Sequence, residues 1–94
     1  MTHDIRHETD LNRFSTTVDD HLCVLEYELG DKVMTITHTR VPQAVGGKGI
    51  AADLTRTALD NARANNWQVV PQCSYAAVYI KRYPEYADLT VSTR

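Results

Sequence analysis

The chain of 94 residues has room for one domain, and 43% hydrophobic with 23% charged residues is the composition of an ordinary globular protein. Its formal net charge of -2 gives no broad positive field, which argues against a protein that grips a nucleic-acid backbone. The longest apolar run, residues 76–80, is too short to cross a bilayer, and residues 1–10 form a polar leader without the apolar stretch of a signal peptide. We therefore expect a single cytoplasmic domain, residues 1–94, that binds neither nucleic acid nor membrane.

Three strands are expected in the first half of the chain. A short one covers residues 13–16, where an arginine, a phenylalanine and β-branched residues precede an Asp-Asp turn. Apolar and polar residues then alternate over residues 23–29 and again over residues 33–39, as in strands with one buried face. The Gly-Asp pair between these two runs supplies a turn, so the two strands are predicted to form a hairpin.

Two helices and one further strand are expected in the second half. A glycine-rich segment, residues 43–49, leads into a helix from Ile50 to about Asn65, because small and apolar residues recur there at helical spacing. A short buried strand covers residues 67–71, and a last helix runs from Tyr75 to about Arg82. The tail from Glu85 onwards is only weakly patterned.

The two cysteines are expected to be free thiols, since a reducing cytosol and the lack of any C-x-x-C pattern disfavour a disulfide or a metal cage. No histidine pair has ligand spacing with a carboxylate, so no metal site is predicted. Cys23 lies midway along an alternating strand and is interpreted as a small buried residue. Cys73 lies before the last helix, whose N-terminus lowers a thiol pKa; a reactive thiolate and a buried side chain both stay open there.

Gly46, Gly47 and Gly49 lie between a predicted strand and the start of a predicted helix. Unpaired backbone amides and the positive end of the helix dipole favour an anion at such a place, and missing side chains let a phosphate come close. The spacing fits neither the P-loop nor the G-x-G-x-x-G pattern. The glycines alone leave two interpretations open, a phosphate cradle and a flexible turn ahead of a helix.

His38 and a set of tyrosines are the remaining candidates. The alternation puts His38 on one strand face with Met34 and Ile36, so it is either a core histidine with a backbone partner or a base at a strand end. Three tyrosines recur every four residues along and just beyond the last helix and are expected to pack as a stripe: Tyr75, Tyr79 and Tyr83.

Taken in order, three segments resemble the smallest members of the GNAT superfamily of acetyl-CoA-dependent N-acetyltransferases. The segments are His38-Thr39-Arg40-Val41-Pro42, then Gly47-Lys48-Gly49-Ile50-Ala51 opening a helix, then Val70-Pro71-Gln72-Cys73-Ser74-Tyr75. The likeness extends from Ile5 to Leu89. It implies an α+β fold: a mixed, mostly antiparallel sheet of about four strands, a central helix after the phosphate loop, and a C-terminal helix.

The resemblance also implies a cofactor, acetyl-CoA, and its contacts. In this superfamily the strand before the loop pairs its backbone with the pantetheine arm, the loop amides hold the pyrophosphate, and the next strand splays away to admit the thioester. The implied cofactor residues are His38, Thr39, Arg40, Val41, Gly46, Gly47, Lys48, Gly49, Ile50, Ala51 and Cys73. The sequence departs from the usual loop at Ala44, where a basic or amide residue is common, and at Gly46, where small relatives commonly have an arginine. Lys48 is expected to replace that charge.

Three residues are the candidate catalytic groups. His38 would take the proton of an amine, and Tyr79 is the nearest match to the tyrosine that protonates the departing thiolate in larger relatives. Cys73 would lie close to the cofactor sulfur, where it would either orient the thioester or briefly accept the acetyl group. The leading interpretation is an N-acetyltransferase, monomeric or a small homo-oligomer, acting on an unidentified amine of a small molecule or a protein. Two alternatives stay open: a non-catalytic CoA or acyl-CoA-binding module, and a cysteine-dependent hydrolase or redox sensor that pairs Cys73 with His38.

Overall fold

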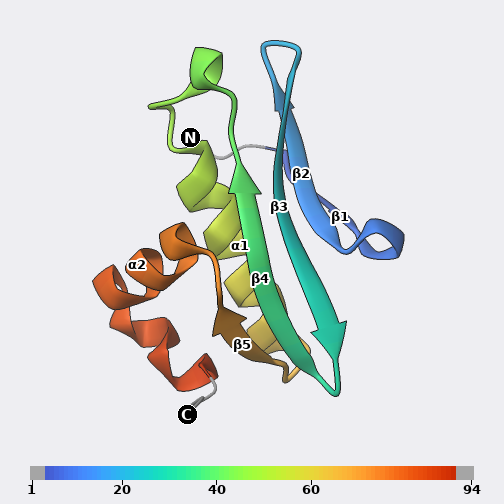
Figure 1. Cartoon of the computed structure of the whole chain (residues 1–94), viewed down its shortest axis with the longest axis vertical. Helices are drawn as coiled ribbons and strands as arrows, with labels where there is room; N and C mark the ends of the chain where they lie inside the picture. Colours follow the sequence, from blue (N-terminus) through green and yellow to red (C-terminus); the bar gives the residue numbers. More distant parts are fainter. Residues whose placement is uncertain (1–3, 91–94) are drawn as a thin grey trace.

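The computed structural model describes residues 4–90 and contains one five-stranded sheet in the order β1-β2-β3-β4-β5 (Figure 1). Four strands are antiparallel neighbours in sequence order: β1 (Arg6–Glu8), β2 (Arg13–Val18), β3 (His21–Gly30) and β4 (Val33–Arg40). The last, β5 (Gln68–Pro71), joins β4 in parallel. The helices are α1 (Ile50–Ala64) and α2 (Ser74–Arg82), and three 3-10 segments are η1 (Thr9–Leu11), η2 (Gln43–Val45) and η3 (Pro84–Leu89).

The predicted α+β fold with a mixed, mostly antiparallel sheet is confirmed, with five strands in place of about four. The extra strand, β1, falls inside the segment that the sequence analysis treats as a polar leader. It is missed because its residues are polar, yet His7 stacks on Phe14 with ring centroids 4.0 Å apart and hydrogen-bonds the Tyr27 hydroxyl at 2.7 Å. A half-buried histidine therefore fastens the edge strand to the sheet.

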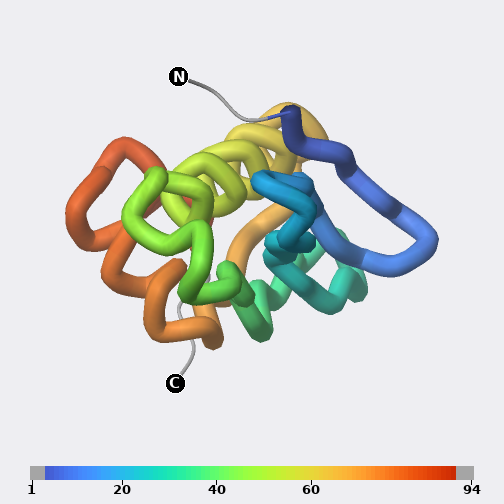
Figure 2. The backbone as a smooth tube through the Cα atoms, turned by 90° about the horizontal axis from the view of Figure 1, so that it is seen from above, coloured from blue at the N-terminus to red at the C-terminus, as the bar shows by residue number. Residues whose placement is uncertain are grey.

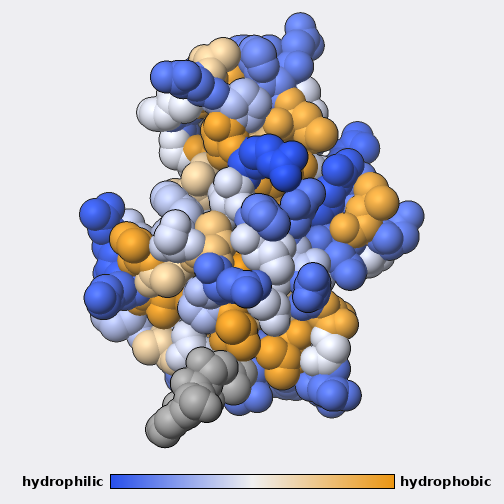
Figure 3. Space-filling model, viewed as in Figure 1, coloured by the Kyte–Doolittle hydropathy of each residue, from blue (hydrophilic) through white to orange (hydrophobic). Residues whose placement is uncertain are grey.

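The hydrophobic core lies between α1 and one face of the sheet, and Figure 2 shows α1 running across that face while α2 lies to its side. The opposite face carries no helix among the described residues, and Figure 3, viewed from that side, shows a mosaic of hydrophilic and hydrophobic side chains. Fully buried side chains join the helix to four strands: Phe14, Leu25, Met34, Ile36, Ile50, Leu54, Leu59 and Val69. Over residues 4–90, no helix is both long and apolar enough to cross a bilayer.

A β-bulge in β4 corrects the expected position of His38. Tyr27 pairs with Ile36 but Glu26 pairs with His38, so Thr37 is an extra residue with no partner in the register. One inserted residue reverses the alternation of faces. His38 therefore leaves the core face that Ile36 occupies and lies on the helix-free face, with 66% of its side chain exposed.

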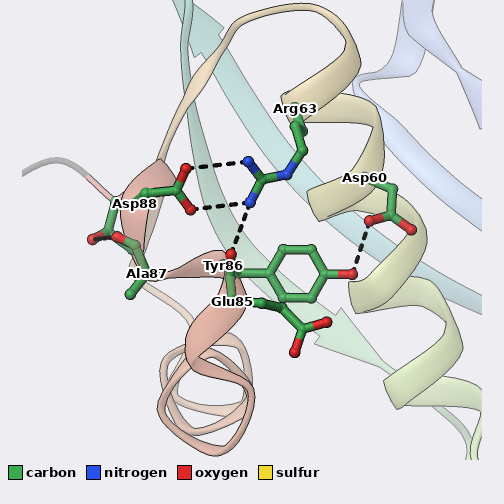
Figure 4. Close-up of polar contacts among 7 residues, drawn as sticks. Asp60, Arg63, Glu85, Tyr86, Ala87 and Asp88 are labelled. Carbon is green, nitrogen blue, oxygen red and sulfur yellow. Dashed lines mark hydrogen bonds and ion pairs between the residues drawn. The ribbon is translucent and has the colours of Figure 1, made fainter.

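The segment after α2, only weakly patterned in the sequence, is the ordered segment η3, which folds back onto α1. Arg63 of α1 contacts both carboxylate oxygens of Asp88, at 3.1 and 3.0 Å, and donates to the carbonyl oxygen of Glu85 (Figure 4). The Tyr86 hydroxyl donates to Asp60 of α1 at 2.8 Å. After η3, Thr90 forms a parallel bridge with Val69 of β5. These contacts hold the end of the described chain against the last turns of α1.

We predict that Tyr86→Phe lowers the free energy of unfolding by about 1.5 kcal/mol at neutral pH. The substitution removes the hydrogen bond that the Tyr86 hydroxyl donates to the charged carboxylate of Asp60. Burial and the Asp60 carboxylate raise the pKa of Tyr86 from 10.0 to about 12. A pKa raised on folding means that the unfolded chain ionises first, so this stabilisation is complete below about pH 10 and is lost as the pH rises towards 12. Urea unfolding at pH 7 and at pH 11 should show the difference between wild type and variant shrinking.

The matched control is Tyr83→Phe, because Tyr83 is 42% exposed and a change at such a surface position costs within about 0.5 kcal/mol. Equal effects of the two substitutions at pH 7 would contradict the assignment of this stability to the Tyr86 hydroxyl.

Candidate functional site

The loop between β4 and α1 has the backbone that its glycines permit. Gly47 has φ 81° and Gly49, the residue that precedes the first turn of α1, has φ 74°, a left-handed conformation that side chains rarely adopt. A Cβ atom added at either position would meet no atom within 4 Å. The glycines are therefore required by the conformation of the chain, and the space beside them is open.

This loop borders a hollow of about 360 Å³ that joins the end of β4 to the first turns of both helices. Its lining residues are Val41, Gly46, Gly47, Gly49, Ile50, Ala51, Ala52 and Tyr75. The first six are predicted cofactor residues, and the sequence analysis missed the last two. Because the backbone amides at the start of a 15-residue helix have no partner within the helix, this hollow suits an anion.

A second hollow of about 200 Å³ adjoins the first through Ala52 and Tyr75, which line both. Tyr79 lines this second hollow, between the rings of Tyr75 and Tyr83, whose centroids lie 6.4 and 4.6 Å from its own. The expected tyrosine stripe is confirmed. Burial, followed by the neighbouring Tyr83, raises the pKa of Tyr79. The position of Tyr75 in the first turn of a helix that faces the glycines was the signal that could have identified it.

Lys48 does not line the first hollow but points to the turn between β2 and β3. Its Nζ lies 3.1 Å from a carboxylate oxygen of Asp19, and both side chains are at least half exposed. That turn and the glycine loop lie at the same end of the sheet (Figure 1). The cation that the sequence analysis expects to contact a pyrophosphate is therefore already paired with an anionic side chain.

The sheet opens next to this loop, between β4 and β5. The register of the parallel pair ends at Ile36 and Pro71, while β4 continues to Arg40. The backbone amide of Cys73 still donates to the carbonyl of Ile36, at 2.8 Å, and the chain then turns into α2. Cys73 consequently lies at the point where the two strands part, and its Sγ is 3.5 Å from the hydroxyl of Thr39.

The surroundings of Cys73 favour its thiolate. Burial by itself would raise the pKa of the thiol, but hydrogen bonds from the Thr39 hydroxyl and from the backbone amides of Ala76 and Tyr75 outweigh it and lower the pKa below 9.0. Cys23, in contrast, is fully buried in β3, and burial raises its pKa. The buried position of Cys23 agrees with its interpretation as a small core residue, and of the two interpretations left open for Cys73 this arrangement favours the reactive thiolate.

His38 does not join Cys73. Its Nδ1 lies 3.7 Å from Glu26 Oε1 on the helix-free face, whereas Thr39, the next residue along β4, contacts Cys73 on the other side. Arg40 also points to the helix-free face, with 70% of its side chain exposed. The Cys-His pair that a cysteine-dependent hydrolase requires is therefore not formed. Among residues 4–90, no three His, Cys, Asp or Glu side chains gather to hold a metal ion.

We predict that iodoacetamide labels Cys73 with a rate midpoint below pH 9.0, because the hydrogen bonds to its sulfur stabilise the thiolate. Thr39→Val keeps the shape of the side chain but removes the hydroxyl, so it should move the midpoint to higher pH. Peptide mapping by mass spectrometry separates the two cysteines, and the slow labelling of Cys23 is the internal control. An unchanged midpoint in the variant would show that the hydroxyl has no part in the thiol's acidity.

The chain is similar in sequence to known proteins of one family. The family described as GCN5-related N-acetyltransferase matches residues 13–89. The human protein NATD1 is 36% identical over 85 residues, a match covering 85% of this chain and 75% of the human one, and NATD1 of the chicken, Gallus gallus, is 35% identical over 85 residues, covering 85% and 77%.

A solved structure has the same arrangement of elements. The solution structure of a GCN5-like protein from Staphylococcus aureus, determined by NMR, superposes with a TM-score of 0.74 at 26% identity and covers 97% of this chain and 90% of that one. The match over residues 13–89, the NATD1 relatives and this shared fold agree with one another. The chain therefore belongs to the GCN5-related N-acetyltransferase family.

Proposed function

We propose that this protein binds acetyl-CoA and transfers its acetyl group to an amine. One observation carries the proposal: the opening between β4 and β5 begins beyond Ile36, and Val41, the residue directly after β4, lines the hollow at the glycine loop. The start of α2 borders both, since Cys73 lies at the opening and Tyr75 lines the hollow. A ligand with a pyrophosphate at one end and a thioester at the other fits this pair of features.

The residues present are suited to each part of that ligand. Backbone amides of residues 46–51 would bind the pyrophosphate, where the dipole of α1 adds to their effect. Residues 38–41 of β4 and the loop, beyond the last pair with β5, would hold the pantetheine arm through their backbone. Thr39 and Cys73 would face the thioester. When bound, acetyl-CoA supplies an activated acetyl group, and the chain supplies position and electrostatics.

Catalysis then requires a proton acceptor for the amine and a proton donor for the leaving sulfur. In our proposal the neutral amine attacks the thioester carbonyl, the C–S bond breaks, and the amine proton passes to His38 directly or through water. A backbone amide near the opening stabilises the developing oxyanion. Tyr79 would donate the proton to the leaving sulfur, since its hydroxyl, like that of any tyrosine, is protonated at neutral pH. Cys73 orients the thioester, and direct transfer needs no protein nucleophile.

A second candidate function is a CoA or acyl-CoA-binding module without turnover. The position of His38 favours it, because the candidate base lies exposed on the helix-free face, whereas Thr39 and Cys73 meet on the other side of β4. This candidate predicts affinity for the cofactor but no product from any amine.

Titration calorimetry with acetyl-CoA, followed by thiol release against a panel of small amines and peptides, separates the two candidates. We expect binding, with CoA release that depends on the amine. Cys73→Ala should retain transfer within about a hundredfold if the cysteine only orients the thioester, because a misplacement of about 1 Å costs that much. Binding without amine-dependent release would favour the binding module, and absence of binding would reject both.

We also predict that Asp19→Asn strengthens CoA binding by about twofold to fivefold, since exposed ion pairs of this kind are worth up to about 1 kcal/mol and Lys48 becomes free for phosphate. Pantetheine, which has no phosphate, serves as the control ligand and should bind both proteins equally. Asp20→Asn in the same turn is the control variant. If Lys48 never contacts the phosphates, Asp19→Asn will leave the ratio of CoA to pantetheine affinity unchanged.

A further inference from the structure

We propose that Glu26 of β3 is a positioning residue that orients the His38 imidazole, with its Nδ1–H towards the carboxylate and its Nε2 lone pair free to accept the proton of the substrate amine. This inference deepens the proposed function and rests on it for its catalytic part. The orientation of the ring, however, is a property of the protein alone. It can be measured without cofactor or substrate.

The bulge in β4 creates the pair. In an unbroken register, Thr37 would pair with Glu26, and His38 would pair with the residue before Glu26 in β3. The extra residue, Thr37, instead puts His38 directly opposite Glu26, on the helix-free face. The Thr37 hydroxyl donates to the backbone carbonyl of Glu26 at 3.2 Å, so the bulge is fastened to the residue that His38 faces.

Two side chains of β4 approach the same oxygen of Glu26. His38 Nδ1 and Arg40 Nη2 each lie 3.7 Å from Oε1. These distances are in the range of ion pairs and exceed that of a direct hydrogen bond, as is common for catalytic groups before the substrate binds. A carboxylate near one imidazole nitrogen favours the tautomer with the proton on that nitrogen, which leaves the other nitrogen as the base.

The placement of His38 suits an amine that approaches from the side opposite the sulfur. Its neighbour Thr39 faces Cys73, so His38 lies on the helix-free side of β4 and Thr39 lies on the opposite side. Both lie beyond the last β4–β5 pair, where the edge of β4 is released from the sheet. A base on one side and the thioester on the other gives the amine a route to the carbonyl through the opening.

The first test is spectroscopic. Long-range proton–nitrogen NMR of imidazole-labelled protein, near pH 8, reports which nitrogen of His38 carries the proton. We expect mainly the Nδ1–H form in wild type and a clear gain of the Nε2–H form in Glu26→Gln. Glu28→Gln is the matched control, because Glu28 is two residues along the same strand, on the same face, and pairs with Thr35. The same tautomer ratio in wild type and Glu26→Gln would overturn the proposal.

The second test is kinetic and distinguishes action through His38 from a general structural effect. We expect Glu26→Gln to lower kcat by about tenfold and to leave KM for the amine little changed. A tenfold loss is part of the roughly hundredfold or larger rate increase that a general base contributes. In a His38→Gln background the same change should alter kcat by less than about twofold, since its partner is gone. An equal loss in both backgrounds would overturn the proposal, whereas a wild-type protein without any transfer would reject the proposed function and leave the NMR result to decide the orientation.

Discussion

The end of the pairing between β4 and β5 is the constraint on which the site depends. Pro71 has no backbone N–H to give to a ladder, so the parallel pair that begins at Val33 and Gln68 stops where the proline stands. Cys73 then makes one more backbone contact, with Ile36, before the chain turns away. The sheet therefore does not continue between β4 and β5 beyond this point. An opening follows, and the start of α2 is fixed beside it.

A second local irregularity decides which side chains face the opening. Without the bulge at Thr37, His38 would share the core face with Ile36, and Thr39 would point away from Cys73. With it, the hydroxyl of Thr39 polarises the thiol and the imidazole of His38 lies on the free face. Sheet irregularities of this kind are frequent next to active sites, because one added residue redirects every side chain that follows.

The regular elements could be predicted from the sequence, and the irregular ones could not. The helix beginning at Ile50 and the hairpin around Gly30 follow from periodicity and turn residues, and the structure confirms both. The strand β1 was missed because a three-residue edge strand has no alternation to detect, and its anchor, His7, packs as an aromatic ring. The bulge was missed because nothing in residues 33–40 signals an insertion until the partner strand fixes the register. The partner of Lys48 was missed for the same reason, because Asp19 lies 29 residues earlier in the chain and only the folded sheet brings the two together.

The two ends of helix α1 contact different parts of the molecule. Its first turn borders the glycine loop, and its last turns carry Asp60 and Arg63, which hold η3 (Figure 4). The two ends of this 15-residue helix are about 22 Å apart. The ring of Tyr86 in η3 nevertheless lies 6.2 Å from the ring of Tyr79, which lines the second hollow. A substitution in the C-terminal segment can therefore alter the shape of that hollow through α2, with no change in α1.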